Sequence, residues 1–406
     1  MKQHIIILAV LLAACSSPKK DVKTVPEATT PVAITSPATK GANLPYLTVG
    51  QNNSLYHCWV EKSEDTTLLK YAKYVDEAWT TPTTIAAGSD WFVNWADYPM
   101  ISHTKNGLMA HFLAKSSTET YAYDVNLIAD SGQGWSAPFK AHNDDSKIEH
   151  GFVTMLPLSD STFQVAWLDG RNTGGSGHEE GNHGGGGAMT LRTAVIGLDG
   201  SITEESELDN RTCDCCQTSG AITSEGPVFV YRDRSELEVR DIFITRKLNG
   251  KWSNPAPIAH DNWNISGCPV NGPRADAIGN NLASAWYTAA NNQSKVKVVF
   301  SKDAGKSFGE PITVDAQFPL GRVDLTMLNE STAIVSWLTK EGDFTLIKAR
   351  KVFKNGTMDP PIVISETSDS RGSGFPQMEK VGDEIYFAWT ALEEERTRIK
   401  MAKISL

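Results

Sequence analysis

Arginine is the residue of this sequence whose distribution most directly suggests binding of a ligand. Seven arginines fall in, or at the ends of, segments that read as loops, and six of them, all but Arg240, are candidate ligand contacts: Arg171, Arg232, Arg234, Arg274, Arg322 and Arg371. A guanidinium group holds a planar carboxylate or phosphate through two parallel hydrogen bonds, so a cluster of them would suit an anionic ligand. The same residues could instead form a structural ion-pair network with nearby acids such as Asp233 and Asp241.

Candidate acids and a candidate nucleophile lie together in the segment GSDWFVNWADYP (88–99). Cleavage of a glycosidic bond needs a proton donor and a second carboxylate or, in some enzymes, a tyrosine nucleophile. Asp90, Asp97 and Tyr98 could fill these roles. Trp91 and Trp95 flank the acids and could stack on a sugar ring, although filling of a central channel is the alternative role.

Histidines and cysteines supply the remaining reactive side chains. His150, with His142, His178, His183 and His260 in similar segments, could contact a ligand, but no spacing matches an established zinc site, and we expect no metal or cofactor. Three cysteines stand in RTCDCCQTSG (211–220), namely Cys213, Cys215 and Cys216, and Cys268 follows in GCPVNGP. We expect a disulfide from Cys268 to one of the three, with a soft-metal site on these four cysteines as the alternative. Cys58 is expected to be a buried free thiol.

The first residues predict export. MKQHIIILAVLLAACSS has a positive start and a short apolar run, which are typical of a signal peptide, and Leu12 to Cys15 resembles a bacterial lipobox. We therefore expect residues 1–15 to be a lipoprotein signal, Cys15 to carry lipid, and residues 16–28 to be a flexible tether. The expected location is the outer membrane, on a side that the sequence does not decide. The net charge of −10 argues against a nucleic-acid partner, and we expect a monomer.

An internal repeat predicts the architecture that must position these residues. A short run of alternating small and apolar residues that ends in an aromatic residue occurs seven times, at intervals of 51 to 64 residues. The aromatic residues are Trp59, Phe112, Trp167, Tyr231, Trp286, Trp337 and Trp389. About four short strand-like runs accompany each aromatic, and no segment has a helical period. This pattern indicates an all-β propeller of seven four-stranded blades, or six as the alternative, in a single domain over residues 29–406. The segment TTPVAI (29–34) is expected to supply the missing outer strand of the last blade.

The blade pattern also predicts where the unusual loops lie. Turns between the first and second strands, and between the third and fourth, are short. The long loops, which hold the candidate residues above, fall on the opposite face, so we expect the ligand there. The cysteine triplet is predicted to lie on the inner strand of the fourth blade, beside Cys268.

Several segments resemble sialidase-type propellers with bacterial neuraminidase repeats. SKDAGKSF (301–308) matches the Asp-box pattern, DSGQGW (130–135) is a degenerate copy, and DWFVNWADYP, CDCCQT, VYRDRS, GCPVNGP and GRVDL are similar to a bacterial group of such proteins. The resemblance implies a propeller fold, an arginine cluster that holds a carboxylate, and an exo-α-sialidase-like glycoside hydrolase. The Arg-Ile-Pro triplet of sialidases is absent from the N-terminal part. A non-catalytic glycan- or protein-binding scaffold, and an envelope metal-binding protein that uses the cysteines and histidines, are the alternative functions.

Overall fold

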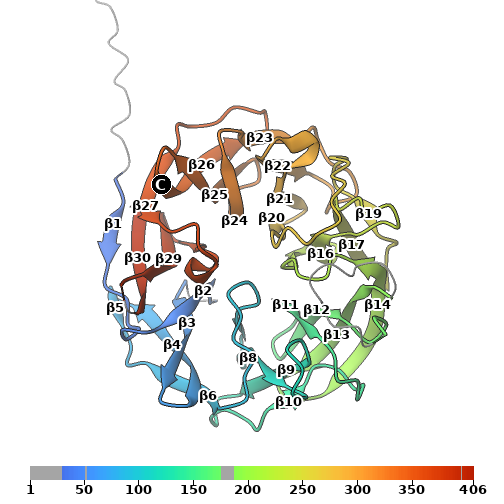
Figure 1. The fold of residues 1–406 in the computed structure, drawn as a ribbon, viewed down its shortest axis with the longest axis vertical. Coiled ribbons are helices and arrows are strands. Elements are labelled where there is room, and N and C mark those ends of the chain that lie inside the picture. Colours follow the sequence, from blue (N-terminus) through green and yellow to red (C-terminus); the bar gives the residue numbers. More distant parts are fainter. Residues whose placement is uncertain (1–29, 51–52, 175–186, 395) are drawn as a thin grey trace, which may run out of the picture.

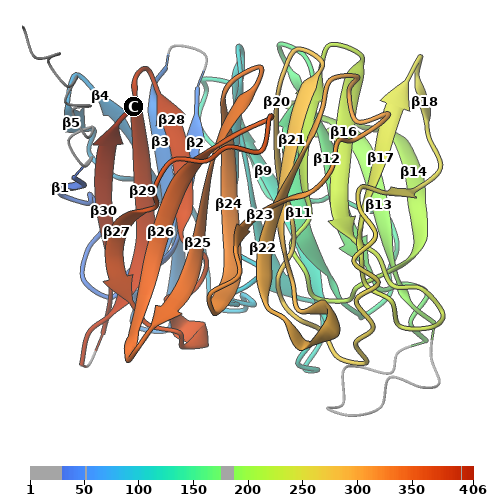
Figure 2. The same ribbon diagram turned by 90° about the horizontal axis from the view of Figure 1, so that it is seen from above.

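The computed structural model describes residues 30–50, 53–174, 187–394 and 396–406, which form a ring of seven antiparallel sheets around a central axis (Figure 1). Seen from the edge of the ring, the strands run between its two faces (Figure 2). The prediction of a seven-bladed β-propeller is confirmed, and the six-bladed alternative is wrong. The signal segment, Cys15 and the tether lie outside the described residues.

Each blade adds its strands in chain order from the axis outward. Blade one holds β2 (Asn43–Val49), β3 (Leu55–Ser63), β4 (Thr66–Val75), β5 (Ala78–Trp79) and β6 (Thr83–Gly88). Blade two holds β7 (Ile101–Thr104), β8 (Gly107–Lys115), β9 (Tyr123–Asp130) and β10 (Phe139–Lys140). Blade three holds β11 (His150–Pro157), β12 (Thr162–Asp169), β13 (Met189–Gly197) and β14 (Ile202–Thr212).

The later blades repeat this order. Blade four holds β15 (Ser219–Thr223), β16 (Gly226–Arg232), β17 (Ile242–Leu248), β18 (Lys251–Trp252) and β19 (Ala256–Pro257). Blade five holds β20 (Arg274–Ile278), β21 (Asn281–Thr288), β22 (Lys295–Ser301) and β23 (Ile312–Asp315). Blade six holds β24 (Pro319–Asn329), β25 (Thr332–Glu341), β26 (Phe344–Phe353) and β27 (Ile362–Thr367). Blade seven holds β28 (Gln377–Val381), β29 (Glu384–Leu392) and β30 (Thr397–Ser405).

The N-terminal strand β1 (Val32–Ile34) closes blade seven, as predicted. It pairs antiparallel with β30, with Ala33 opposite Ala402. The chain therefore begins and ends its ring in the same sheet, which covers an otherwise unpaired edge of β30.

The seven repeated aromatic residues all lie on the second strand of their blades and are buried. Four of the tryptophans donate the indole N–H to a carboxylate: Trp59 to Glu61, Trp167 to Asp169, Trp286 to Asp261 and Trp337 to Asp315, at 2.6–2.8 Å. A buried indole needs such an acceptor, because an unpaired N–H would cost free energy. The repeated aromatic residue of the sequence thus occupies the same packing position in each blade.

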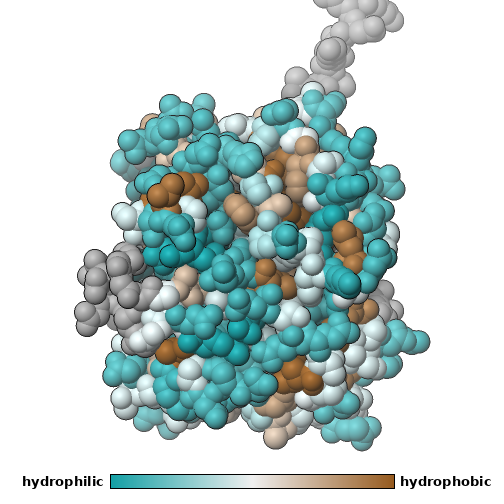
Figure 3. All heavy atoms as spheres, turned by 90° about the vertical axis from the view of Figure 1, so that its right-hand side faces the viewer, coloured by the Kyte–Doolittle hydropathy of each residue, from teal (hydrophilic) through white to brown (hydrophobic). Residues whose placement is uncertain are grey.

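The apolar core is divided among the interfaces between neighbouring blades. One cluster joins blades five and six, for example through Val298 and Trp337, and another joins blades six and seven through Ile347 and Phe387. On the side that faces right in Figure 1, the outer surface is mainly hydrophilic, and its apolar residues form separate patches (Figure 3). Each sheet therefore buries both of its faces and exposes its outer edge.

Near the axis, side chains of one inner strand hydrogen-bond the backbone of the next blade. The Ser219 hydroxyl accepts from the Ala275 N–H at 3.0 Å. The Asp276 carboxylate accepts from the Met327 N–H at 2.7 Å. These side-chain links take the place of backbone ladders, because inner strands of different blades belong to different sheets. We call them the inter-blade links.

Asp324 of blade six forms a further inter-blade link. Its Oδ2 accepts from the Met378 N–H of blade seven at 2.7 Å, and its Oδ1 accepts from the Leu325 N–H at 2.9 Å. The residue is 8% exposed. Both oxygens are therefore paired, which offsets part of the free energy of burying the carboxylate.

The turn that resembles an Asp box lies between the third and fourth strands of blade five, as expected. Asp303 accepts from the Ser307 N–H at 2.9 Å and from the Ser301 hydroxyl at 2.7 Å. In blade two, Asp130 organises the related turn by accepting from the N–H groups of Gly132 and Gly134. In both turns one aspartate satisfies backbone donors that strand pairing leaves unused.

Removal of β1 should destabilise the ring. A chain that starts at residue 36 loses the pairing with β30, and we expect its free energy of unfolding to fall by at least about 1 kcal/mol, since each lost hydrogen bond contributes roughly that much. A chain that starts at residue 29 keeps β1 and is the control. Urea denaturation of both chains tests this, and equal midpoints would show that β1 does not close the propeller.

Candidate functional site

The loop between β6 and β7 reaches across the axis at the loop-rich face. The Ala96 carbonyl accepts from the Gln217 side chain at 2.7 Å, and Gln217 also accepts from the Gly272 N–H at 3.0 Å. Trp95 stacks on Phe375, with ring centroids 5.7 Å apart. Segments that lead into four different blades therefore meet over the channel, and Trp95 packs against one of them.

Deeper in the channel lies a polar cavity of about 180 Å³, which we call the axial cavity. Inner strands of blades one, three, four, five, six and seven line it. Its charged and phenolic lining residues are Tyr46, Arg274, Asp276, Asp324 and Glu379. It thus combines three carboxyl groups with a single arginine, on the symmetry axis of the ring.

Unlike Asp276 and Asp324, Glu379 lines the axial cavity without forming one of the inter-blade links described above. Burial raises the pKa of Glu379 well above its usual value, and the nearby carboxylates Asp324 and Asp276 raise it further. Burial also raises the pKa values of Asp276 and Asp324. This shift is toward the neutral, protonated form of Glu379, the form that can donate a proton or a hydrogen bond to a ligand.

Of the residues expected to form the site, Tyr98 and Arg274 come together. The guanidinium Nη2 of Arg274 donates to the Tyr98 hydroxyl, and its Nε lies 3.6 Å from Asp324 Oδ1. Burial raises the pKa of Tyr98, although the charge of Arg274 opposes the shift. Arg274 lines the axial cavity, and it therefore connects Tyr98 to this cavity.

The other candidates of the same loop lie elsewhere. Asp97 is buried beside Gly151, where it accepts from the Phe152 N–H at 2.9 Å, and a Cβ added at Gly151 would lie only 2.0 Å from its second oxygen. Burial raises the pKa of Asp97 well above its usual value. Asp90 is exposed, and Trp91 stacks on Phe112 with ring centroids 4.2 Å apart. The structure does not bring Asp90, Asp97 and Tyr98 into one pocket.

Two of the remaining arginines are held by backbone carbonyl groups. Arg232 donates to the carbonyls of Asn271, Arg240 and Tyr287. Arg322 donates to the carbonyls of Asp369, Ser370 and Gly374 and to the Ser373 hydroxyl. Burial lowers the pKa of Arg322 to about 10, although the charge of Asp369 opposes the shift. Both side chains tie loops together.

The other three arginines lie at different places on the loop-rich face. Arg171 makes a bidentate contact with Asp169 at 2.7–2.8 Å. Arg234 pairs with Glu238 at 2.8 Å and with Asp214 at 3.2 Å. Arg371 is exposed in the short helix η2 (Arg371–Ser373). The expected arginines are thus spread over several structural contacts, and only Arg274 lines the axial cavity.

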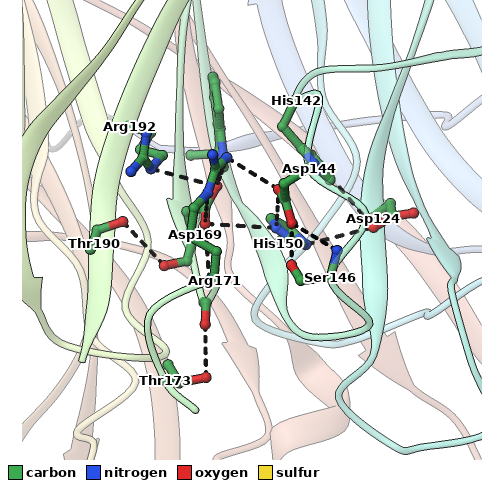
Figure 4. Close-up of polar contacts among 12 residues, drawn as sticks. Asp124, His142, Asp144, Ser146, His150, Asp169, Arg171, Thr173, Thr190 and Arg192 are labelled. Atoms are coloured by element: carbon green, nitrogen blue, oxygen red, sulfur yellow. Dashed lines mark hydrogen bonds and ion pairs between the residues drawn. The ribbon is translucent and has the colours of Figure 1, made fainter. Parts of the chain in front are cut away.

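A second polar centre lies between blades two and three, and we call it the Asp/His cluster (Figure 4). It consists of Asp124, His142, Asp144, His150 and Asp169. The two imidazole rings are stacked with centroids 3.8 Å apart, and neither side chain is exposed. Burial, together with the adjacent His150, lowers the pKa of His142 to about 4. His150 therefore belongs to this cluster and lies apart from the residues of the axial cavity.

The cysteines gather as predicted, with one correction to their position. Cys215 and Cys268 form a disulfide with Cα atoms 6.3 Å apart, and Cys213 Sγ lies 3.5 Å from Cys216 Sγ and 3.6 Å from Cys268 Sγ. The prediction that the triplet lies on an inner strand is wrong: β15 begins only at Ser219, because the backbone turns at the cysteines before it can enter the sheet. Because the disulfide takes up Cys215 and Cys268, a soft-metal site on these four cysteines would retain only the thiols of Cys213 and Cys216.

Comparison with known proteins supports the fold. No protein-family model matches the sequence, and no curated protein matches it. A structure of a PL25 ulvan lyase bound to -[GlcA(1-4)Rha3S]- is similar with 10% sequence identity and a TM-score of 0.56, over 92% of this chain and 96% of that chain. The phage phi92 endosialidase has 10% identity and a TM-score of 0.52, over 95% and 71% of the two chains. The polysaccharide lyase Uly1 has 10% identity and a TM-score of 0.51, over 95% and 94%. The chain thus shares its propeller fold with these proteins.

The sequence did not single out Tyr46, Asp276, Asp324 and Glu379. A usable signal was present, because polar residues alternate along two inner strands, as Arg274 with Asp276 and Gln377 with Glu379. Side chains two positions apart on a strand share a face, so this alternation marks polar groups that point the same way. Asp124, Asp144 and Asp169 gave no comparable signal, since they stand in separate segments.

Thiol labelling tests the cysteine arrangement. When the protein is unfolded without reductant in the presence of iodoacetamide, we expect Cys58, Cys213 and Cys216 to be alkylated and a peptide pair linked through Cys215 and Cys268. Peptide mass spectrometry measures both. Recovery of Cys268 linked to Cys213, or of Cys215 in alkylated form, would contradict the structure. The reduced protein is the control for complete labelling.

The pH dependence of the free energy of unfolding should reveal the raised pKa of Glu379. A carboxyl group whose folded pKa is raised stabilises the fold below its unfolded pKa, and this stability is lost as the pH rises through the folded pKa. Glu379→Gln should therefore gain stability over wild type as the pH rises from about 5 to 9, by about 1.4 kcal/mol per pKa unit of the shift. Urea denaturation across pH measures the difference. Exposed Asp343, as Asp343→Asn, is the control, and a pH-independent difference for Glu379→Gln would refute the assignment.

Proposed function

We propose that this chain is a carbohydrate-binding propeller and that a sugar ring occupies the axial cavity. The observation that carries the proposal is the lining, in which Arg274 and Glu379 stand among hydroxyl-bearing residues such as Thr154 and Thr218. Sugar hydroxyl groups both donate and accept hydrogen bonds, so they can pair with a guanidinium, a carboxylate and a neutral carboxyl group at the same time. The cavity of about 180 Å³ is below the ~300–1,000 Å³ typical of drug-sized ligands, which favours one ring over a longer saccharide.

Charge favours an uncharged ring over an anionic group in this position. Asp276 and Asp324 oppose the single Arg274, and Arg274 already contacts Asp324. An added carboxylate or sulfate would repel the acids more than the arginine attracts it. Two structural neighbours are polysaccharide lyases and a third is an endosialidase, and these names agree with a saccharide ligand.

Hydrolysis is the second candidate function, and Glu379 is the observation that favours it. A neutral carboxyl group at a sugar site can protonate the leaving oxygen of a glycosidic bond. In this scheme Glu379 takes the role of acid that the sequence suggested for Asp90 or Asp97. The hydroxyl of Tyr98, which Arg274 contacts, is the candidate nucleophile.

A glycan array and a panel of fluorogenic glycosides separate binding from hydrolysis. We expect wild type to bind a defined glycan, Glu379→Trp to lose binding because the indole fills the cavity, and Asp343→Asn to bind as wild type does. If the protein also turns over a glycoside, Glu379→Gln should lower kcat by ~10²-fold or more, as expected for loss of a general acid. Unchanged binding by a folded Glu379→Trp variant would place the ligand elsewhere.

We further propose that the protein is held in the cell envelope by lipid on Cys15. The proposal rests on the apolar run and the lipobox-like residues at the start of the sequence. In the described part of the chain, no helix is long and apolar enough to span a bilayer. In a bacterial host, metabolic labelling with an alkyne fatty acid should mark the wild-type protein and leave Cys15→Ser unmarked, whereas equal labelling of both would exclude Cys15 as the lipid site.

A further inference from the structure

Four of the cysteines bring their sulfur atoms into one series of contacts. Cys213 Sγ lies 3.5 Å from Cys216 Sγ and 3.6 Å from Cys268 Sγ, and Cys268 is bonded to Cys215. We call Cys213 and Cys216 the inner dithiol, and we call the bond between Cys215 and Cys268 the outer disulfide. Exchange of a disulfide begins when a thiolate attacks one of its sulfur atoms. Cys213 touches both a second thiol and a disulfide sulfur, so it is placed for such an exchange.

The inner dithiol and the outer disulfide differ in their exposure to solvent. Cys213 is 1% exposed and Cys216 is 2% exposed. Cys215 and Cys268 are half-buried, and the neighbouring Gly267 faces open space, because a Cβ added there would meet no atom within 4 Å. A molecule in solution therefore reaches the outer disulfide more readily than the inner dithiol.

Positive charge near the inner dithiol favours its thiolate form, which is the nucleophile in exchange. Arg240 is fully buried, and its Nη1 lies 3.1 Å from Cys213 Sγ. Burial opposes ionisation of Cys216, but its hydrogen bond with Cys213 and the nearby guanidinium groups of Arg232 and Arg240 outweigh burial and lower the pKa of Cys216 to about 7. Burial and the adjacent Cys216 raise the pKa of Cys213. The inner dithiol thus holds a proton on Cys213 that the Cys216 thiolate can accept.

We propose that these cysteines form a thiol–disulfide relay, in which the inner dithiol reduces the outer disulfide and the resulting outer dithiol reduces a disulfide of another molecule. In the first step Cys213 passes its proton to Cys216, and its sulfur bonds Cys268 Sγ. The bond between Cys268 and Cys215 breaks, and Cys215 keeps the electron pair and takes a proton from water. In the second step Cys216 loses its proton to water and bonds Cys213 Sγ, while Cys268 leaves as a thiolate.

The electrons balance in both parts of the relay. Within the chain, two thiol sulfurs are oxidised and two disulfide sulfurs are reduced, so this part needs no other reactant. One outer thiolate then attacks the external disulfide and releases a first thiolate, and the second outer sulfur restores the outer disulfide and releases the other. The chain ends with two disulfides, and the inner dithiol has supplied the two electrons. This activity is independent of the axial cavity and of any sugar ligand.

Slow alkylation of the native protein tests the exchange within the chain. Folded wild type is incubated for hours with iodoacetamide at about pH 8, where thiolates react, then quenched with acid, digested and analysed by mass spectrometry. We expect alkylated Cys215 and Cys268 and a new disulfide between Cys213 and Cys216. Cys213→Ser should keep the outer disulfide, and Cys58→Ser should behave as wild type does. An intact outer disulfide beside unlabelled inner thiols, or alkylation of the inner dithiol in folded wild type, would overturn the proposal.

The aromatic disulfide DTNB, which releases a coloured thiolate when it is reduced, tests the reaction with an external disulfide. Folded wild type should release about two coloured thiolates per chain and end with both the inner and the outer disulfide formed. Cys215→Ser/Cys268→Ser, checked for folding by circular dichroism, keeps the inner dithiol but lacks the outer sulfurs, so it should release none. Absence of release from wild type, or equal release from the folded double variant, would overturn the relay.

Discussion

The hydrogen bonds that cross from one inner strand to the next blade hold this propeller together at its axis. Backbone ladders unite strands within each sheet, so the gaps between inner strands are bridged by side chains such as Ser219, Asp276 and Asp324. Each bridge needs a buried polar group. The ring therefore carries carboxylates near its axis for a structural reason, and their charge shapes the axial cavity.

The electrostatics of the cavity follow from these bridges. Asp276 and Asp324 are committed to backbone N–H groups, and their proximity contributes to the raised pKa of Glu379. Arg274 compensates part of this charge and holds Tyr98. A site built in this way has rigid walls, because the residues that line it also close the ring. Rigid walls reduce the entropy lost when a ligand binds.

The candidate ligand-binding side chains of the loop-rich face make contacts within the protein. Arg232 and Arg322 donate to backbone carbonyls, Arg171 and Arg234 pair with carboxylates, and Trp95 fills the space above the channel. These contacts fasten long connections to one another. The axial cavity is lined by inner strands rather than by these loop side chains.

The sequence predicted the features that depend on a repeated environment. The seven aromatic positions, the closing strand β1 and the meeting of Cys268 with the cysteine triplet each follow from a blade that recurs at a known interval. The sequence could not predict which groups a given polar side chain contacts in the folded protein. Arg322 and Arg274 occupy similar places in the sequence pattern, yet one binds carbonyl groups and the other lines a cavity. The Asp/His cluster combines side chains of three elements, and only their packing brings them together.

Hydrogen exchange with bound ligand tests the central claim most directly, namely that a sugar binds on the propeller axis. Backbone amide exchange is followed by mass spectrometry with and without the glycan that binds best. The account predicts slower exchange in peptides that contain β20, β24 and β28, with little change in residues 141–149 and 168–174. Protection confined to those two loop segments, with β20, β24 and β28 unchanged, would contradict it.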